Sequence, residues 1–229
     1  MSRKTVYPHH NITLIVILFL ILVIVIFALL IGLIGTAFAK VGFSPATVAI
    51  ILVATFLGSM VNIPLFKLKT TVPILKEEYV SFFGMVYRVP QVEYGEKTTL
   101  VAINLGGALI PTAISLYLLW KVPSAIIYAI IAIAIVALVN HAVARPVKGV
   151  GITAPAFVSP IVAALVAYLL PFSTPQIIAY VAGVLGTLIG ADLTNLHVIP
   201  KLGAPIASIG GAGTFDGVFL SGIIAALLA

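Results

Sequence analysis

Seven long apolar runs, separated by prolines, glycines and charged residues, limit what this chain can fold into. Each run is close to the roughly 17 to 25 residues that a helix needs to cross a bilayer. The predicted spans are Ile12 to Ala39, Ser44 to Ile63, Thr98 to Trp120, Pro123 to Ala144, Thr153 to Leu170, Thr174 to His197 and Ile206 to Leu228. We therefore expect an all-α membrane protein, a seven-transmembrane helix bundle that forms one integral membrane domain over residues 1–229.

The composition supports this expectation and excludes other classes. Of 229 residues, 62% are hydrophobic and only 8% are charged, which leaves too little polar surface for a soluble protein. The chain has no cysteine, so disulfides, thiolate metal sites and cysteine nucleophiles are excluded. The net charge of +6 does not indicate nucleic-acid binding, because the basic residues are scattered between apolar runs.

The distribution of the basic residues predicts the orientation in the membrane. If all seven runs span, ten Lys and Arg residues lie on one side and only Lys40 and Lys121 on the other. By the positive-inside rule, the N-terminus is cytoplasmic and the C-terminus lies outside. This pattern is typical of a protein that crosses a prokaryotic inner membrane several times. The lipid bilayer is therefore an expected partner.

One sizeable polar segment interrupts the apolar pattern. Residues 66–97 hold all four glutamates, and Tyr79 to Val89 mixes aromatic and β-branched residues next to turn signals at Pro90 and Tyr94-Gly95. We expect a short cytoplasmic hairpin there. Residues 1–65 would then hold two helices, residues 98–171 three, and residues 174–229 a final helix pair.

The chain has only two aspartates, Asp192 and Asp216, and both fall inside predicted membrane helices. An ionisable group at the bilayer centre costs about 2.5 to 3.5 kcal/mol on insertion scales, which indicates a functional role. The two helices are joined by a short turn and must run antiparallel. At about 1.5 Å rise per residue, the aspartates lie roughly 12 and 16 Å deep, at nearly the same level.

Glycines near both aspartates indicate that the two helices approach closely. Gly186 and Gly190 precede Asp192 at GxxxG spacing, and Gly213 and Gly217 flank Asp216 at the same spacing. Three glycines at 210, 211 and 213 also predict a local unwinding beside a cavity. Two carboxyls a few ångströms apart in a low dielectric cannot both ionise, so the pair is expected to share a proton, as in aspartyl proteases.

The C-terminal part of the chain, roughly residues 174–229, resembles the GxGD-type intramembrane aspartyl proteases, the presenilin and signal peptide peptidase group. Ala191-Asp192-Leu193 followed by Pro200-Lys201 is similar to one motif of that family, although Ala191 replaces the usual Tyr. The segment from Gly211 to Ser221 is similar to the other motif, with Thr214 and Phe215 inserted before Asp216.

The resemblance implies a hydrolase that cleaves transmembrane peptides. Its catalytic residues would be Asp192 and Asp216, with water as the nucleophile and no cofactor or metal. The substrate-binding residues would be Gly211, Gly213, Thr214, Phe215 and Asn195. The possible partner is a transmembrane peptide substrate, and the sequence leaves the oligomeric state open.

Two other interpretations remain open at this point. Asp192, Thr194, Asn195 and Asp216 on glycine-broken helices would also suit a proton or cation site of a small-solute transporter. Alternatively, the aspartates hydrogen-bond neighbouring backbone in a non-catalytic membrane scaffold. His141 near a helix end is interpreted as an interfacial residue, and the sequence contains no HExxH zinc motif.

Overall fold

A computed structural model describes residues 12–82, 85–147, 151–211, 213 and 216–229. Short apolar helices and five strands alternate along this part of the chain. In chain order they are α1 (Ile12–Lys40), α2 (Pro45–Gly58), β1 (Asn62–Phe82), β2 (Met85–Asn104), α3 (Ile110–Lys121), α4 (Ile126–Val143), β3 (Arg145–Val147), β4 (Gly151–Thr153), α5 (Val158–Leu169), α6 (Pro175–Thr187), β5 (Ile206–Ile209) and α7 (Gly217–Leu228).

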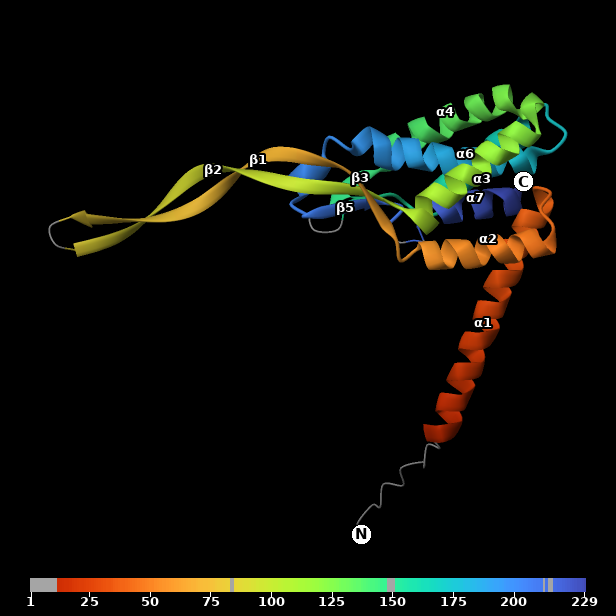
Figure 1. Cartoon of the computed structure of the whole chain (residues 1–229), viewed down its shortest axis with the longest axis horizontal. Coiled ribbons are helices and arrows are strands. Elements are labelled where there is room, and N and C mark those ends of the chain that lie inside the picture. The colour runs from red at the N-terminus through yellow and green to blue at the C-terminus, as the bar shows by residue number, and fades with distance from the viewer. Residues whose placement is uncertain (1–11, 83–84, 148–150, 212, 214–215) are drawn as a thin grey trace, which may run out of the picture.

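Helix α6 forms the centre of the helical bundle, with α3, α4, α5 and α7 packed around it. Its residues from Ile177 to Val184 are buried, and all of them are apolar or aromatic except Gly183. By contrast, α1 extends away from the bundle, and its long apolar surface is exposed (Figure 1). Only its last turn joins the core, where Phe38 is buried and the Lys40 Nζ donates to the Leu227 carbonyl at 2.6 Å.

Three helices of the described chain are long and apolar enough to cross a membrane, namely Leu14–Lys40, Pro123–Val143 and Pro175–Asn195. Four apolar helices are shorter, Pro45–Gly58, Leu105–Lys121, Val158–Leu169 and Gly217–Leu228. The helical, apolar character of the fold is therefore established by the structure. A bundle of seven full spans remains a prediction.

Three of the predicted spans were wrong at their N-terminal ends, and one was wrong at its C-terminal end. Thr153 lies in β4 and α5 begins only at Val158, while Asn62 and Ile63, at the end of the second predicted span, begin β1. The two longest strand segments inside predicted spans are Thr98 to Asn104, which belongs to strand β2, and Ile206 to Ile209, which forms strand β5. A short apolar run has no periodicity that separates a buried strand from a helix, so both were assigned to the helix that follows them. The break predicted at the glycines near residue 210 is confirmed and is larger than expected, because α7 begins only at Gly217.

The polar segment forms a β-hairpin, as predicted, but a much longer one. Strands β1 and β2 pair antiparallel from Asn62 opposite Asn104 to Phe82 opposite Met85, with an irregularity between Pro64 and Phe66. This two-stranded ribbon projects far from the helices (Figure 1). Ion pairs on its exposed surface include Lys69 with Glu96 at 3.3 Å and Arg88 with Glu77.

The base of the ribbon continues into the helical bundle as a three-stranded sheet. Strand β5 pairs parallel with β2, from Leu100 opposite Ile206 to Ile103 opposite Ile209, and the strand order is β1-β2-β5. Among the described residues, β5 is therefore an edge strand. A parallel partner so distant in sequence explains why the strand escaped prediction.

Buried Asn104 fastens this sheet to the helices. Its Nδ2 donates to the Ser59 carbonyl at 2.8 Å and to the Asn62 Oδ1 at 3.1 Å, and its Oδ1 accepts from the Gly107 N–H at 2.8 Å. The Ser208 hydroxyl of β5 donates to the same Asn62 oxygen at 2.5 Å. One side chain thus holds α2, β2 and the turn that begins α3.

Replacing Asn104 is expected to destabilise the fold, because its buried partners would lose their hydrogen bonds. Asn104→Ala is predicted to lower the free energy of unfolding by about 2 to 4 kcal/mol. Thr98→Ala, an exposed position on the same strand, should change it by less than about 0.5 kcal/mol. Thermal unfolding in detergent would measure both, and equal stabilities of the two variants would contradict the assigned role.

The glycine contacts between helices differ from the predicted ones. A Cβ on Gly186 would lie 2.6 Å from the Val136 side chain, and one on Gly190 would lie 2.2 Å from the Ala137 carbonyl, so both glycines face α4. The close approach of α6 to α7 instead uses Gly183, where a Cβ would lie 2.8 Å from the Ser221 carbonyl. Gly186 and Gly190 were identified correctly as packing residues, but their partner helix was not. Gly217 was not identified correctly, because a Cβ there would meet nothing within 4 Å.

Candidate functional site

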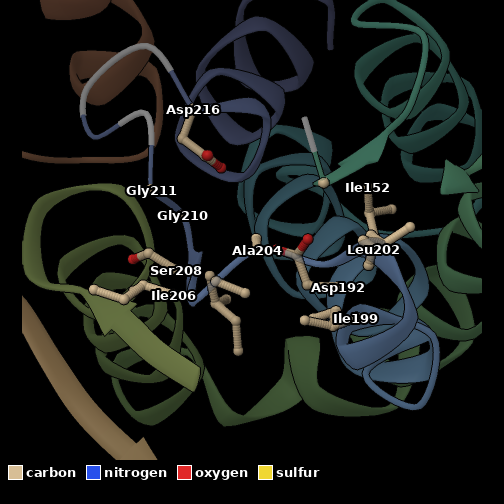
Figure 2. Close-up of a pocket in the computed structure, with 13 residues that line it drawn as sticks. Ile152, Asp192, Ile199, Leu202, Ala204, Ile206, Ser208, Gly210, Gly211 and Asp216 are labelled. Carbon is tan, nitrogen blue, oxygen red and sulfur yellow. The ribbon is translucent and has the colours of Figure 1, made fainter. Parts of the chain in front are cut away.

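A partly polar cavity lies where α6 ends and the segment leading to α7 begins. It has a volume of about 340 Å³. Its walls come from β4, from the turns after α6, from β5 and from the glycine turn before α7. The lining residues are Gly151, Ile152, Asp192, Ile199, Leu202, Ala204, Ile206, Ala207, Ser208, Ile209, Gly210, Gly211 and Asp216. Both aspartates of the chain therefore line one cavity (Figure 2).

Asp192 reaches the cavity from a distorted end of α6. The α-helix ends at Thr187 and widens into a π-helical turn, Leu188–Asp192, which is followed by the 3-10 turn Leu193–Asn195. A π-helical turn inserts an extra residue into the helix and redirects the side chains after it, and such turns are frequent at functional sites. Gly190 permits the close packing of this turn on α4.

Asp216 reaches the cavity from the start of α7, where it is the N-cap residue. Its backbone is extended, with φ −69° and ψ 148°, and its Oδ1 accepts a hydrogen bond from the Val218 N–H at 2.9 Å. Such a cap satisfies a donor that the first turn of a helix leaves unpaired. The prediction that Asp216 lies inside a membrane helix was therefore wrong, because the chain becomes helical only after it.

The two carboxyl groups point into the cavity from opposite sides (Figure 2). The charge of Asp216 acts electrostatically on Asp192. Asp216 also lies at the positive end of the α7 dipole, which stabilises negative charge there. The arrangement is a pair of interacting carboxyls beside a partly polar cavity, with the edge strand β5 running along one wall.

The five predicted substrate-binding residues have different positions. Gly211 lines the cavity, whereas Gly213 adopts a left-handed φ of +64° and packs against Ser59. Asn195 is buried and does not line the cavity, and its Nδ2 donates to the Ala191 carbonyl at 2.9 Å. Thr214 and Phe215 lie outside the described residues.

Sequence reasoning missed the walls of the cavity. Ser208 and its neighbours in β5 were assigned to a helix, and Ile152 in β4 was assigned to the connection between two predicted spans. Three prolines, at 146, 155 and 205, and the glycines beside them were signals of non-helical backbone in these segments.

No group of three or more His, Cys, Asp or Glu side chains is placed to hold a metal ion within the described ranges.

These features define the class of the protein, which has apolar helices of membrane-spanning length and a two-aspartate cavity at the ends of two neighbouring helices. Residues 56–228 match the family model described as "Protein of unknown function (DUF1614)", and the chain belongs to that family. The matched range includes the ribbon, the cavity and both aspartates. No curated protein and no solved structure matches the chain.

Proposed function

We propose that the protein is an intramembrane aspartyl peptidase-like hydrolase that cleaves membrane-embedded peptides with Asp192 and Asp216. The observation that carries this proposal is the convergence of the two aspartates on one cavity of about 340 Å³. They come from the end of one apolar helix and the start of the next. The resemblance of these two segments to the GxGD proteases supports the same function.

The chemistry requires one ionised and one protonated carboxyl. The ionised member removes a proton from water as the water oxygen attacks the carbonyl carbon of the scissile bond, and the protonated member donates its proton to the carbonyl oxygen. Collapse of the tetrahedral intermediate breaks the C–N bond, and the leaving nitrogen takes up a proton from the pair. Two nearby carboxyls supply both states, because they act as a unit.

The strand β5 supplies a binding surface suited to an extended peptide. Its residues Ile206 to Ile209 all line the cavity, and only β2 pairs with it within the described chain. An extended peptide that adds to a sheet edge gains backbone hydrogen bonds, whatever its side chains are. This mode fits a protease whose substrate helix must unwind before the peptide bond becomes accessible.

The membrane orientation follows from the positive-inside pattern and belongs to the proposal. The protein lies in an inner membrane, with its N-terminus in the cytoplasm and its C-terminus outside. The ribbon then extends into the cytoplasm. The aspartates then lie toward the cytoplasmic side of the bilayer. The partners are the lipid bilayer and a transmembrane peptide.

Transport is the second candidate function, and buried hydroxyls favour it. The hydroxyls of Tyr180 and Thr187 in α6 and of Ser221 in α7 are buried and make no hydrogen bond within the described part of the protein. Polar groups inside a helical bundle, together with two aspartates, are typical of proton or cation pathways. A transporter would use the same Asp192 and Asp216 as its ion site.

The deciding experiment uses protein reconstituted into liposomes with a panel of single-span peptides. Cleavage by the wild-type protein that is lost in both Asp192→Asn and Asp216→Asn supports the peptidase. Absent cleavage, with aspartate-dependent proton or Na⁺ flux in the same liposomes, supports transport. Neither cleavage nor flux by the wild-type protein, with both variants folded and unchanged in thermal stability, supports a scaffold.

A further inference from the structure

A chain of hydrogen bonds connects α4 to the turn that carries Asp192. The His141 Nδ1 lies 2.9 Å from the Thr194 Oγ1, and the Thr194 hydroxyl donates to the Gly190 carbonyl at 2.7 Å. His141 lies in the last turn of α4, whereas Gly190 and Thr194 lie on either side of Asp192 in the chain. The contact therefore joins two helices at the edge of the candidate site.

The direction of each hydrogen bond follows from a count of protons. The Gly190 carbonyl oxygen has no proton, so the single hydroxyl proton of Thr194 must lie between these two oxygens. The Thr194 oxygen can then only accept from His141. Consequently, the Nδ1 of His141 carries a proton, and the Nε2 of the neutral imidazole is unprotonated.

These bonds act on backbone in the distorted end of α6. The π-helical turn and the following 3-10 turn depart from regular α-helical geometry, and the carbonyls of Gly190 and Ala191 there accept hydrogen bonds from side chains. Asn195 supplies the other bonds, with its Nδ2 2.9 Å from the Ala191 carbonyl. Among the hydrogen bonds described for this turn, only the one from His141 comes from another helix.

We propose that His141 is a positioning residue for Asp192, acting through Thr194 and the Gly190 carbonyl. It holds the end of α6 at a fixed distance from α4, and thereby fixes the direction of the Asp192 carboxyl. The proposal rests on the proposed function only in treating Asp192 as a reacting group. The hydrogen-bond chain and its effect on the Asp192 carboxyl are testable without any cleavage.

The first test is solid-state NMR of the full-length protein in bilayers, labelled with ¹⁵N-histidine and carboxyl-¹³C-aspartate. At alkaline pH, His141 is expected to be protonated at Nδ1, and Thr194→Val should shift it to the Nε2–H form. Since the chain has only two aspartates, two carboxyl signals are expected, and Asp192→Asn assigns them. The Asp192 signal should shift in His141→Leu and Thr194→Val.

The matched controls keep the relevant hydrogen bonds. His141→Asn places an amide N–H near the position of Nδ1, and Thr194→Ser keeps the hydroxyl, so both should preserve the Asp192 signal. An Nε2–H tautomer in the wild-type protein would overturn the proposal. An Asp192 signal that stays unchanged in both His141→Leu and Thr194→Val would overturn it as well.

The second test is the kinetics of cleavage. His141→Leu and Thr194→Val are each expected to lower kcat about tenfold with little change in KM, because the substrate still binds while the carboxyl is misdirected. The double variant should lose no more than either single variant. His197→Gln is the control, since its Nδ1 contacts only the Thr194 carbonyl of its own turn, at 3.1 Å.

The two tests separate the two proposals. An equal loss of kcat in His197→Gln, or additive losses in the double variant, would contradict the role of the His141 contact. If the wild-type protein cleaves no peptide, the proposed function fails, and the NMR result still decides whether His141 positions Asp192.

Discussion

Asp216→Asn is expected to lower the rate of peptide cleavage by at least about a thousandfold and to leave the Tm nearly unchanged. The two effects separate because Asp216 caps α7 and, in the proposed mechanism, also takes part in proton transfer. Its Oδ1 caps α7 through the Val218 N–H, and an asparagine side-chain oxygen caps a helix as well as an aspartate does. Asparagine cannot, however, accept a proton from water. Cleavage assays and thermal unfolding of the same preparation would measure both.

Asp216→Ala removes the cap as well as the carboxyl. It is expected to lose cleavage to the same extent and to lower the free energy of unfolding by about 1 kcal/mol. Ser44→Ala is the matched control, because Ser44 caps α2 by accepting from the Thr47 N–H at 3.3 Å and lies outside the cavity. It should cost similar stability without loss of cleavage. Normal cleavage by Asp216→Asn would exclude the aspartyl mechanism.

The meeting of the two aspartates followed from simple sequence features. Both lie close to one short connection, and antiparallel helices joined in this way bring their connected ends together. The rise per residue placed the carboxyls at similar depths, under the assumption of unbroken helices. The structure reaches the same convergence differently, since Asp192 ends a π-helical turn and Asp216 precedes its helix. The convergence of the two aspartates was therefore predicted by their position beside a short connection more than by helical geometry.

The walls of the cavity depend on pairing that a single sequence does not reveal. Strand β5 has four residues, and its parallel partner lies more than a hundred positions earlier in the chain. The apolar run Ile206-Ala207-Ser208-Ile209 suits a strand or a helix equally well. The ribbon could be predicted as a hairpin because its β-branched and aromatic residues and its turn signals are local. Its full length could not, since the apolar residues 98–104 continue into the next helix.

The glycines show the same distinction between local and long-range information. Their small size indicated close packing, but only the fold determines which backbone lies opposite. Gly107 illustrates this point, because it faces Gly210 in the turn that leads to Asp216. A Cβ added to Gly107 would lie 2.1 Å from the Gly210 carbonyl oxygen and 2.8 Å from that of Gly213. Both neighbours are backbone atoms of one turn, so no side-chain rotation can relieve the overlap.

Gly107→Ala is therefore expected to displace the turn that positions Asp216. We predict a loss of about 3 kcal/mol in the free energy of unfolding, and a fall in cleavage of about a hundredfold in the protein that remains folded. The effect on cleavage is expected because the Gly213 N–H donates to the Gly210 carbonyl at 2.9 Å and the Asp216 N–H donates to the Gly213 carbonyl at 3.0 Å, so that a shift at Gly210 would move Asp216, one of the two proposed catalytic residues. Thermal unfolding and cleavage assays at a temperature well below the Tm would separate the two effects.

Gly35→Ala is the matched control for this substitution. Gly35 lies in α1, and a Cβ there would meet nothing within 4 Å. Because alanine has a higher helix propensity than glycine, this variant should be as stable as the wild type or up to about 1 kcal/mol more stable. Its cleavage should be unchanged. Wild-type stability and cleavage in Gly107→Ala would mean that the turn before Asp216 does not pack on Gly107. Position 107 would then have no part in placing the second carboxyl.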